Sequence, residues 1–223
     1  MAIGEWYHFF TRGVDKRKVF IHPKDYERFL VHLFVANGTK NVRISDLYDT
    51  SLASVLSNPR IERGNPLVEI GAYALMPSHP HLLIKEIRQK GTALFMQKVL
   101  TGYTMYFNNK YGRTGALFSG TFKSKHVHDD RYLKQVLPYI LLNPVELTNP
   151  YWKNGRGEIN AVATELVSYP YSSAKDFSPD RTSQDQIVST DWSFYYDKQP
   201  TLKEMITGAQ AYYQSLSSTL PQV

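Results

Sequence analysis

Two apolar segments on either side of a short turn place the strongest constraint on how this chain can fold. Residues 66–76 (PLVEIGAYALM) and 79–87 (HPHLLIKEI) have the length and composition of strands, and Met76-Pro77-Ser78 between them has that of a turn. We therefore expect two neighbouring antiparallel strands. Since side chains alternate along a strand, the second strand should present His79, His81, Leu83 and Lys85 on one face.

The flanking segments extend this hairpin into a complete domain. Residues 5–13 and a segment centred on 122–127 have the pattern of strands, whereas residues 22–38, 92–112 and 129–143 have apolar side chains at helical spacing. The order strand, helix, strand, strand, helix, strand predicts an α+β fold of the ferredoxin-like βαββαβ type. Its antiparallel sheet should carry two helices on one face, and residues 129–143 form an added helix. Residues 39–65 read as a long, partly irregular insertion, and residues 178–223 as a C-terminal extension without a clear pattern.

Charge and composition narrow the class of protein. The chain has 223 residues, no cysteine and a net charge of +6; residues 1–160 carry +9 and residues 161–223 carry −3. A basic body with an acidic tail favours a polyanionic partner such as nucleic acid. The sequence has no signal-peptide pattern and no apolar run near the ~20 residues of a membrane span, so we expect a cytoplasmic protein without a membrane partner.

Two histidine pairs are candidates for a metal site. His79 and His81 are two positions apart on a strand, close enough to bind one ion through their imidazole nitrogens. His126 and His128 have the same spacing and stand beside Asp129-Asp130, which could complete a site for a hard cation. In the helix over 129–143, Tyr139 and Asn143 lie one turn apart, where they could reach a metal on an adjacent strand or simply pack and end the helix. Local chemistry does not separate these readings.

Five longer segments resemble the successive motifs of one protein family. FFTRGVDKRKVF, YALMPSHPHLLI, YFNNKYGRTGALFSGTFKSKHV, DDRYLKQVLPYILLNPVE and YPYSSAKDF occur in this order between residue 5 and about residue 177. They are similar to the REP-associated tyrosine transposases, which belong to the HUH (His-hydrophobic-His) single-tyrosine transposase superfamily. The resemblance makes residues 1–177 the expected transposase domain.

This resemblance implies specific roles for the candidate residues. His79, His81 and Asn143 would bind a divalent cation, Mg²⁺ or Mn²⁺, and Tyr139 would be the nucleophile. His126 and His128 fall where the family has no metal motif. The implied activity is cleavage and strand transfer of single-stranded DNA beside a hairpin through a 5′-phosphotyrosine, by a monomer or homodimer.

Basic side chains near these motifs are the candidate DNA contacts. They are Arg12, Lys16, Arg17, Arg113, Lys123 and Lys125, with Phe118 and Phe122 as stacking or core aromatics.

Two prolines depart from a simple reading. Pro80 occupies the hydrophobic position of the histidine motif and should lie at a local strand edge or bulge, and Pro138 should kink the helix just before Tyr139. Two alternatives remain. One is a domesticated hairpin-binding protein with little cleavage activity, which Pro138 keeps open. The other is a metal phosphodiesterase in which Tyr139 only packs.

Overall fold

A computed structural model describes residues 1–150, 152, 158–177, 186–188, 192, 196, 198 and 200–219, with the side chains of the last helix described as far as residue 213. The strands are β1 (Trp6–Phe10), β2 (Val68–Met76), β3 (His79–Glu86) and β4 (Lys123–Val127). The α-helices are α1 (Pro23–Ala36), α2 (Leu52–Ser57), α3 (Gly91–Lys110), α4 (Asp130–Leu142), α5 (Ile159–Ser168) and α6 (Leu202–Thr219). Short 3₁₀ turns form η1 (Val14–Lys16), η2 (Ile44–Asp46), η3 (Asn143–Leu147) and η5 (Ser173–Phe177).

The four strands form one antiparallel sheet in the order β2-β3-β1-β4. Strands β1 and β3 lie at the centre of the sheet, and β4 pairs with β1, which is the ferredoxin-like arrangement. The predicted fold class is therefore confirmed. The two strands joined by the Pro77-Ser78 turn pair directly, with Met76 opposite His79.

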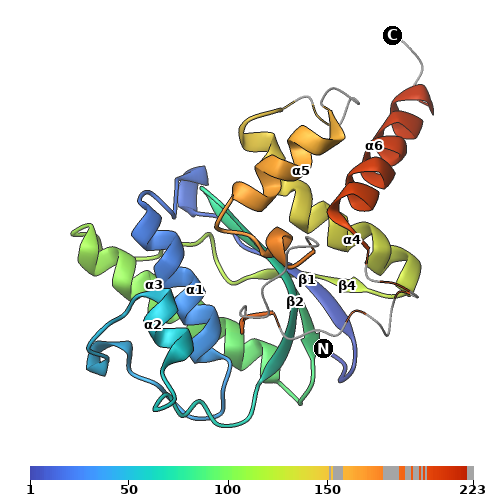
Figure 1. The fold of residues 1–223 in the computed structure, drawn as a ribbon. Coiled ribbons are helices and arrows are strands. Elements are labelled where there is room, and N and C mark those ends of the chain that lie inside the picture. The colour runs from blue at the N-terminus through green and yellow to red at the C-terminus, as the bar shows by residue number, and fades with distance from the viewer. Residues whose placement is uncertain are drawn as a thin grey trace.

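The two faces of the sheet are covered by different helices (Figure 1). On one face α1 and α3 pack together over Phe9, Leu82 and Ile84. On the other face α4 packs over Trp6 and Leu83, together with α5 and α6. The helices of the βαββαβ unit thus lie on one face as expected, and the added helix α4 lies on the opposite face.

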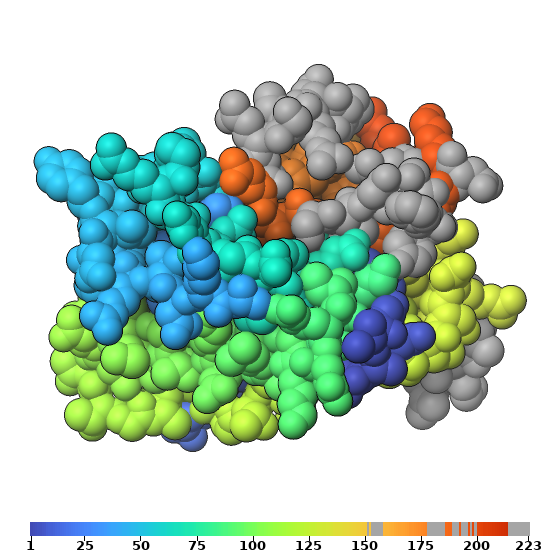
Figure 2. Space-filling view, turned by 90° about the horizontal axis from the view of Figure 1, so that it is seen from below, coloured from blue at the N-terminus to red at the C-terminus, as the bar shows by residue number. Residues whose placement is uncertain are grey.

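The insertion over residues 39–65 contains η2 and α2 but is otherwise irregular, as the sequence indicated. It lies along α1 and α3, and Figure 2 shows its light-blue to cyan surface beside the green surface of α3. Two anchors hold it. The Lys98 ammonium donates to the carbonyl of Lys40 at 3.3 Å, and the Arg63 guanidinium donates to the carbonyl of Phe34 at 3.0 Å. The insertion therefore covers the core helices, and none of its residues lines the site cavity described below.

The C-terminal extension contributes to the core in its described residues, which the sequence did not indicate. Trp192 stacks on Trp6 with ring centroids 5.6 Å apart, and Leu202, Met205 and Ile206 of α6 are buried beside α4. Much of residues 178–199 lies outside the described residues, and a domain boundary after residue 177 stays a prediction. Among the described residues, no helix combines the length and hydrophobicity needed to cross a bilayer.

Candidate active site

Strand alternation brings three histidines to one face of the sheet. Strand β1 presents Trp6, His8 and Phe10 to α4, and it presents Tyr7 and Phe9 to α1 and α3 on the opposite face. On β3, His79 and His81 share one face, as alternation predicts, and the structure shows that this is the face covered by α4. His8 is opposite Leu83 and Phe10 is opposite His81, so His8 is the diagonal cross-strand neighbour of His81.

The three imidazoles form a chain of contacts. His8 Nε2 lies 2.9 Å from His81 Nδ1, and the rings stack with centroids 5.1 Å apart. The His79 ring meets the His81 ring edge-on at 4.8 Å, and His79 Nδ1 is hydrogen-bonded to Ser78 Oγ at 2.9 Å. In both His79 and His81 the Nδ1 atom is therefore engaged, which leaves Nε2 as the nitrogen available to a ligand.

Burial keeps these histidines neutral near pH 7. It lowers the pKa of His8 to about 4, with a further contribution from the positive charge of Lys125. Burial, with His8 and His79 nearby, lowers the pKa of His81 to about 2. The pKa of His79 is also lowered, by burial and by Arg12, against an opposing effect of Glu146. Neutral imidazoles keep the nitrogen lone pair that metal binding requires.

Tyr139 lies over this histidine chain. Asp129 caps α4 by accepting a hydrogen bond from the backbone N–H of Tyr132 at 2.6 Å, and the helix continues through Pro138. Buried leucine and isoleucine side chains hold α4 against the sheet. They leave Tyr139 on its flank with 39% of its surface exposed. Its ring meets those of His8 and His81 edge-on, each at 5.8 Å.

Asn143 follows one turn later and is buried, with its side-chain amide donating to the carbonyl of Tyr139 at 2.8 Å. It does not line the cavity that holds Tyr139. Within the described residues no three His, Cys, Asp or Glu side chains gather as a metal group. Of the three predicted ligands, His79 and His81 line the cavity. The two neutral imidazoles fit a divalent cation that takes its other ligands from water and phosphate, and the role of Asn143 stays a prediction.

An open cavity of about 470 Å³ connects these groups. His8, His79, His81 and Tyr139 line it, and Arg12, Lys16 and Lys123 supply positive charge around them. The Thr11 hydroxyl, also in the lining, is buried and has no hydrogen-bond partner among the described residues. The η1 turn beside it is strained, because Asp15 and Lys16 have φ values of +55° and +58°. A cavity with neutral imidazoles, a phenol and cations is suited to holding a phosphate group.

Half of the six basic candidates do not line this cavity. Lys125 belongs to a second cavity described below. The Arg17 guanidinium bonds to the carbonyl of Val14 and to Asp15, and Arg113 contacts Asn108 near the end of α3. Their proposed DNA contacts stay predictions. Phe118 and Phe122 pack with the core rather than on the cavity, and the Phe122 ring lies 5.3 Å from that of Phe9.

The structure separates the rival histidine pair from this site. His126 is opposite Tyr7, which puts it on the other face of the sheet, and its Nε2 bonds to Glu5 at 2.9 Å. His128 pairs with Asp129 at 3.3 Å and stacks on Tyr132.

The structure also explains how a proline fits at position 80 of β3. Pro80 is opposite Leu75, whose N–H points away to Tyr171, and the pairing of β1 ends at Phe10 opposite His81. Pro80 therefore sits at a local edge, where its missing N–H breaks no ladder bond.

Sequence reasoning missed two residues of the site. Alternation along residues 5–13 predicts that His8 shares a face with Trp6 and Phe10, but it does not connect His8 with the histidine pair. The register that sets it beside His81 could not be read from the sequence. Glu146, in η3, lies near enough to affect the pKa of His79, and the helix spacing from Tyr139 to Glu146 is the only signal that could have pointed to it.

Comparisons with known proteins give a limited result. No family model matches the chain, and no curated protein matches it. Among solved structures, one titled "Structure of the REP associates tyrosine transposase bound to a REP hairpin" is similar to it, with a TM-score of 0.47 and 14% identity over 79% of this chain and 80% of that chain. This likeness in structure is moderate.

Proposed function

We propose that the protein is a metal-dependent single-stranded DNA endonuclease and strand transferase that acts beside DNA hairpins through Tyr139. The observation that carries the proposal is the contact of the Tyr139 ring with both His8 and His81 in a cavity surrounded by Arg12 and two lysines. The motif order that resembles the REP-associated tyrosine transposases supports the same assignment.

The reaction requires a phosphate held against a tyrosine oxygen. The Tyr139 Oη–P bond forms and the P–O3′ bond breaks, and the phenolic proton ends on the released 3′-hydroxyl. A tyrosine has an ordinary pKa near ~10 and attacks poorly at neutral pH. Arg12, Lys16 and Lys123 would orient the phosphate and offset its charge. The energy of the phosphodiester is kept in the phosphotyrosine, so that rejoining needs no nucleotide cofactor.

His79 and His81 would hold the Mg²⁺ or Mn²⁺, with Asn143 as the third protein ligand. The cation would supply Lewis-acid activation of the scissile phosphate. His8 has a supporting role in this proposal. If His81 donates its Nδ1–H to His8 Nε2, the lone pair of His81 is fixed on Nε2, because the hydrogen bond at one ring nitrogen decides which nitrogen can bind a metal.

The test is covalent trapping. The full chain is incubated with labelled hairpin oligonucleotides carrying single-stranded flanks and with Mn²⁺, and denaturation-resistant protein–DNA adducts are digested to locate the modified peptide. We expect an adduct on the peptide that contains Tyr139. An adduct on another tyrosine would overturn the assignment of the nucleophile.

One observation favours a second candidate. The Asn143 amide is directed to the carbonyl of Tyr139, and Asn143 is absent from the cavity lining, an arrangement that suits a hairpin-binding protein with little cleavage activity. Tight hairpin binding without adduct or cleavage product would favour that candidate. Cleaved DNA without any adduct would instead favour a metal phosphodiesterase in which Tyr139 only packs.

A further inference from the structure

A second cavity, of about 760 Å³, adjoins the site between α4 and α6. His8, Phe10 and Tyr139 line both cavities, so the second is continuous with the space around the nucleophile. Figure 1 shows α6 running beside α4 on this side of the molecule. A volume in the range of roughly 300–1,000 Å³ is typical of sites that enclose a small organic group, so a nucleobase has room here.

The lining of this groove between α4 and α6 is aromatic and basic. Five aromatic residues besides Phe10 and Tyr139 contribute to it: Tyr132, Trp152, Tyr196, Tyr212 and Tyr213. The ammonium of Lys125 lies 4.8 Å from the centroid of the Tyr132 ring, and that of Lys134 lies 5.2 Å from the centroid of the Tyr196 ring. One acidic residue, Glu204, also lines the groove, and its carboxylate accepts hydrogen bonds from the backbone N–H and the hydroxyl of Thr201.

A buried donor in the lining has no acceptor within the described part of the chain. Trp152 has 2% of its surface exposed, and its indole N–H has no hydrogen-bond partner among the described residues. A buried N–H group without an acceptor is unfavourable, and an occupant with an acceptor atom would remove that cost. Nucleobases carry such acceptor atoms on their edges.

We propose that the groove between α4 and α6 binds unpaired nucleotides that adjoin the scissile phosphate. Their bases stack on the tyrosine rings, their phosphates lie near Lys125 and Lys134, and a base edge accepts a hydrogen bond from Trp152. This combination of stacking surfaces and lysines is the one that proteins use for single strands. The inference rests on the proposed function for its substrate, and it adds where the single-stranded flank lies.

The first experiment fills the groove. Gly208 of α6 lines it, and a Cβ atom added there meets no atom within 4 Å, so Gly208→Phe places a ring in open space. Ala211→Phe is the matched control, because Ala211 is exposed on the same helix and outside the lining. Affinities are measured without metal, by fluorescence anisotropy, for a hairpin with an unpaired flank and for the same hairpin with blunt ends.

We expect Gly208→Phe to weaken binding of the flanked hairpin by about tenfold, the loss expected when one base no longer stacks. Binding of the blunt hairpin, and both affinities of Ala211→Phe, should not change. Equal affinities of Gly208→Phe and the unaltered chain for the flanked hairpin would overturn the proposal and leave the groove to another occupant, such as a peptide.

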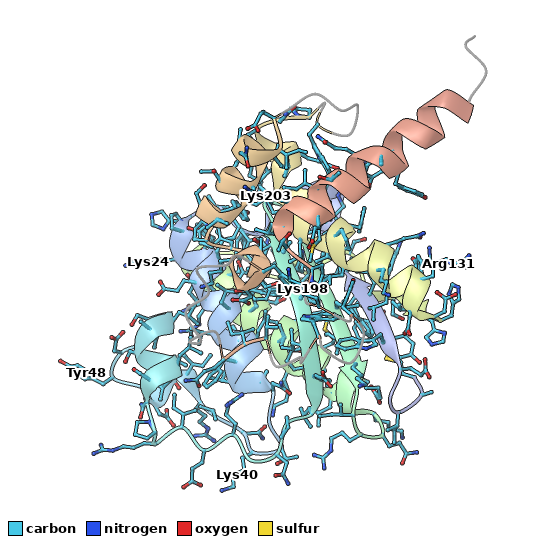
Figure 3. All side chains as sticks on the ribbon, turned by 45° about the vertical axis from the view of Figure 1, so that its right-hand side comes forward. Lys24, Lys40, Tyr48, Arg131, Lys198 and Lys203 are labelled. Carbon is cyan, nitrogen blue, oxygen red and sulfur yellow. The ribbon has the colours of Figure 1, made fainter. Side chains whose placement is uncertain are left out.

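A second pair of variants keeps the proposal testable if Gly208→Phe does not fold. The double change Lys125→Gln and Lys134→Gln should weaken binding of the flanked hairpin and reduce the dependence of its affinity on salt. Lys24→Gln is the control, since Lys24 is an exposed lysine on α1, away from α6 (Figure 3). An unchanged salt dependence in the double variant would contradict the proposal.

The two proposals can fail separately. Because affinity is measured without metal, a defect in Gly208→Phe shows flank binding even if no covalent adduct ever forms. Suppose that Gly208→Phe and the unaltered chain form the Tyr139 adduct equally and bind the flanked hairpin with equal affinity. This result would support the proposed function and show that the groove does not bind the flank.

Discussion

The two faces of the sheet use the same strands for opposite purposes. Toward α1 and α3, Phe9, Phe29 and Tyr103 are fully buried, and the rings of Phe29 and Tyr103 pack edge to face. Toward α4, the alternate positions of the same strands carry His8 and His81, and two open cavities lie above them. Neighbouring residues of a strand thus pack in the core on one face and line open cavities on the other.

This difference depends on the register of β1 against β3. A shift of β1 by a single residue against β3 would turn His8 into the aromatic core and bring Phe9 to the cavity, whereas His81 of β3 would stay on the face of α4. The dense packing of the core face fixes the register and therefore positions the histidines. From this comparison we expect substitutions on the core face to change stability, and substitutions on the site face to change binding and catalysis.

The largest effect should come from Tyr139→Phe. Only the phenolic oxygen is lost, and the ring can still meet His8 and His81, so the covalent adduct should disappear while affinity for hairpin DNA persists. Stability should change by less than about 0.5 kcal/mol, because the side chain is partly exposed. Denaturing gels and thermal unfolding measure both, and Tyr132→Phe is the control. An adduct that survives in Tyr139→Phe would point to Tyr132 as the nucleophile.

The next effect concerns metal binding, which should be confined to the site face. Replacing both His79 and His81 by alanine should remove measurable Mn²⁺ binding in a titration, because the two neutral imidazoles that would hold the ion are lost. The same change at His126 and His128, on the other side of the sheet or beyond its end, should leave Mn²⁺ affinity unaltered. Loss of Mn²⁺ binding only in the variant without His126 and His128 would assign the metal site to that second pair.

The core face could be predicted from the sequence and the site only in part. Apolar periodicity identified β2, β3 and α3, since their patterns arise from packing against one another and are local. The faces of His79 and His81 followed from strand alternation alone. His8 could not be assigned, because its neighbour is 73 residues away and their contact depends on strand register. Helices α5 and α6 could not be predicted from the sequence, because their apolar residues pack against each other and against α4 rather than forming a clear local pattern.

A third prediction concerns Asp25, a buried charge at the edge of the core face. Its carboxylate accepts hydrogen bonds from the Lys110 ammonium at 2.5 Å, the hydroxyls of Tyr106 and Tyr111, and the backbone N–H groups of Ile21 and His22. Asp25→Asn should cost about 3 kcal/mol, because it leaves Lys110 without its counter-charge. Urea unfolding at pH 7 measures this loss, and Asp46→Asn, at an exposed position, is the control. A loss under about 1 kcal/mol would mean that the network contributes little.

The pH dependence of the same variant sharpens the test. Burial by itself would raise the pKa of Asp25, but the hydrogen bonds from Lys110, Tyr111, His22 and Ile21 outweigh it and lower the pKa. A carboxyl whose pKa is lower in the folded protein stabilises it fully above the unfolded pKa near ~4, and this contribution is lost as the pH falls further. The difference in stability between the unaltered chain and Asp25→Asn should therefore shrink below about pH 4. A difference that stays constant from pH 7 to pH 3 would contradict the charge-based explanation.

The smallest effects should come from two helix glycines, one on each side of the sheet. A Cβ atom at Gly102 of α3 would lie 2.6 Å from Cε1 of His32, a buried ring of α1, whereas at Gly208 of α6 it meets no atom within 4 Å. Alanine favours the helix over glycine by about 1 kcal/mol at either position. At Gly102 the clash should exceed this gain, so Gly102→Ala should destabilise the protein by about 1–3 kcal/mol, and Gly208→Ala should stabilise it by up to about 1 kcal/mol. Urea unfolding of both variants distinguishes the tightly packed face from the open one, because the same substitution should change stability in opposite directions. Stabilisation by both substitutions would mean that α1 and α3 can move apart, and that the register of the site does not depend on a rigid core.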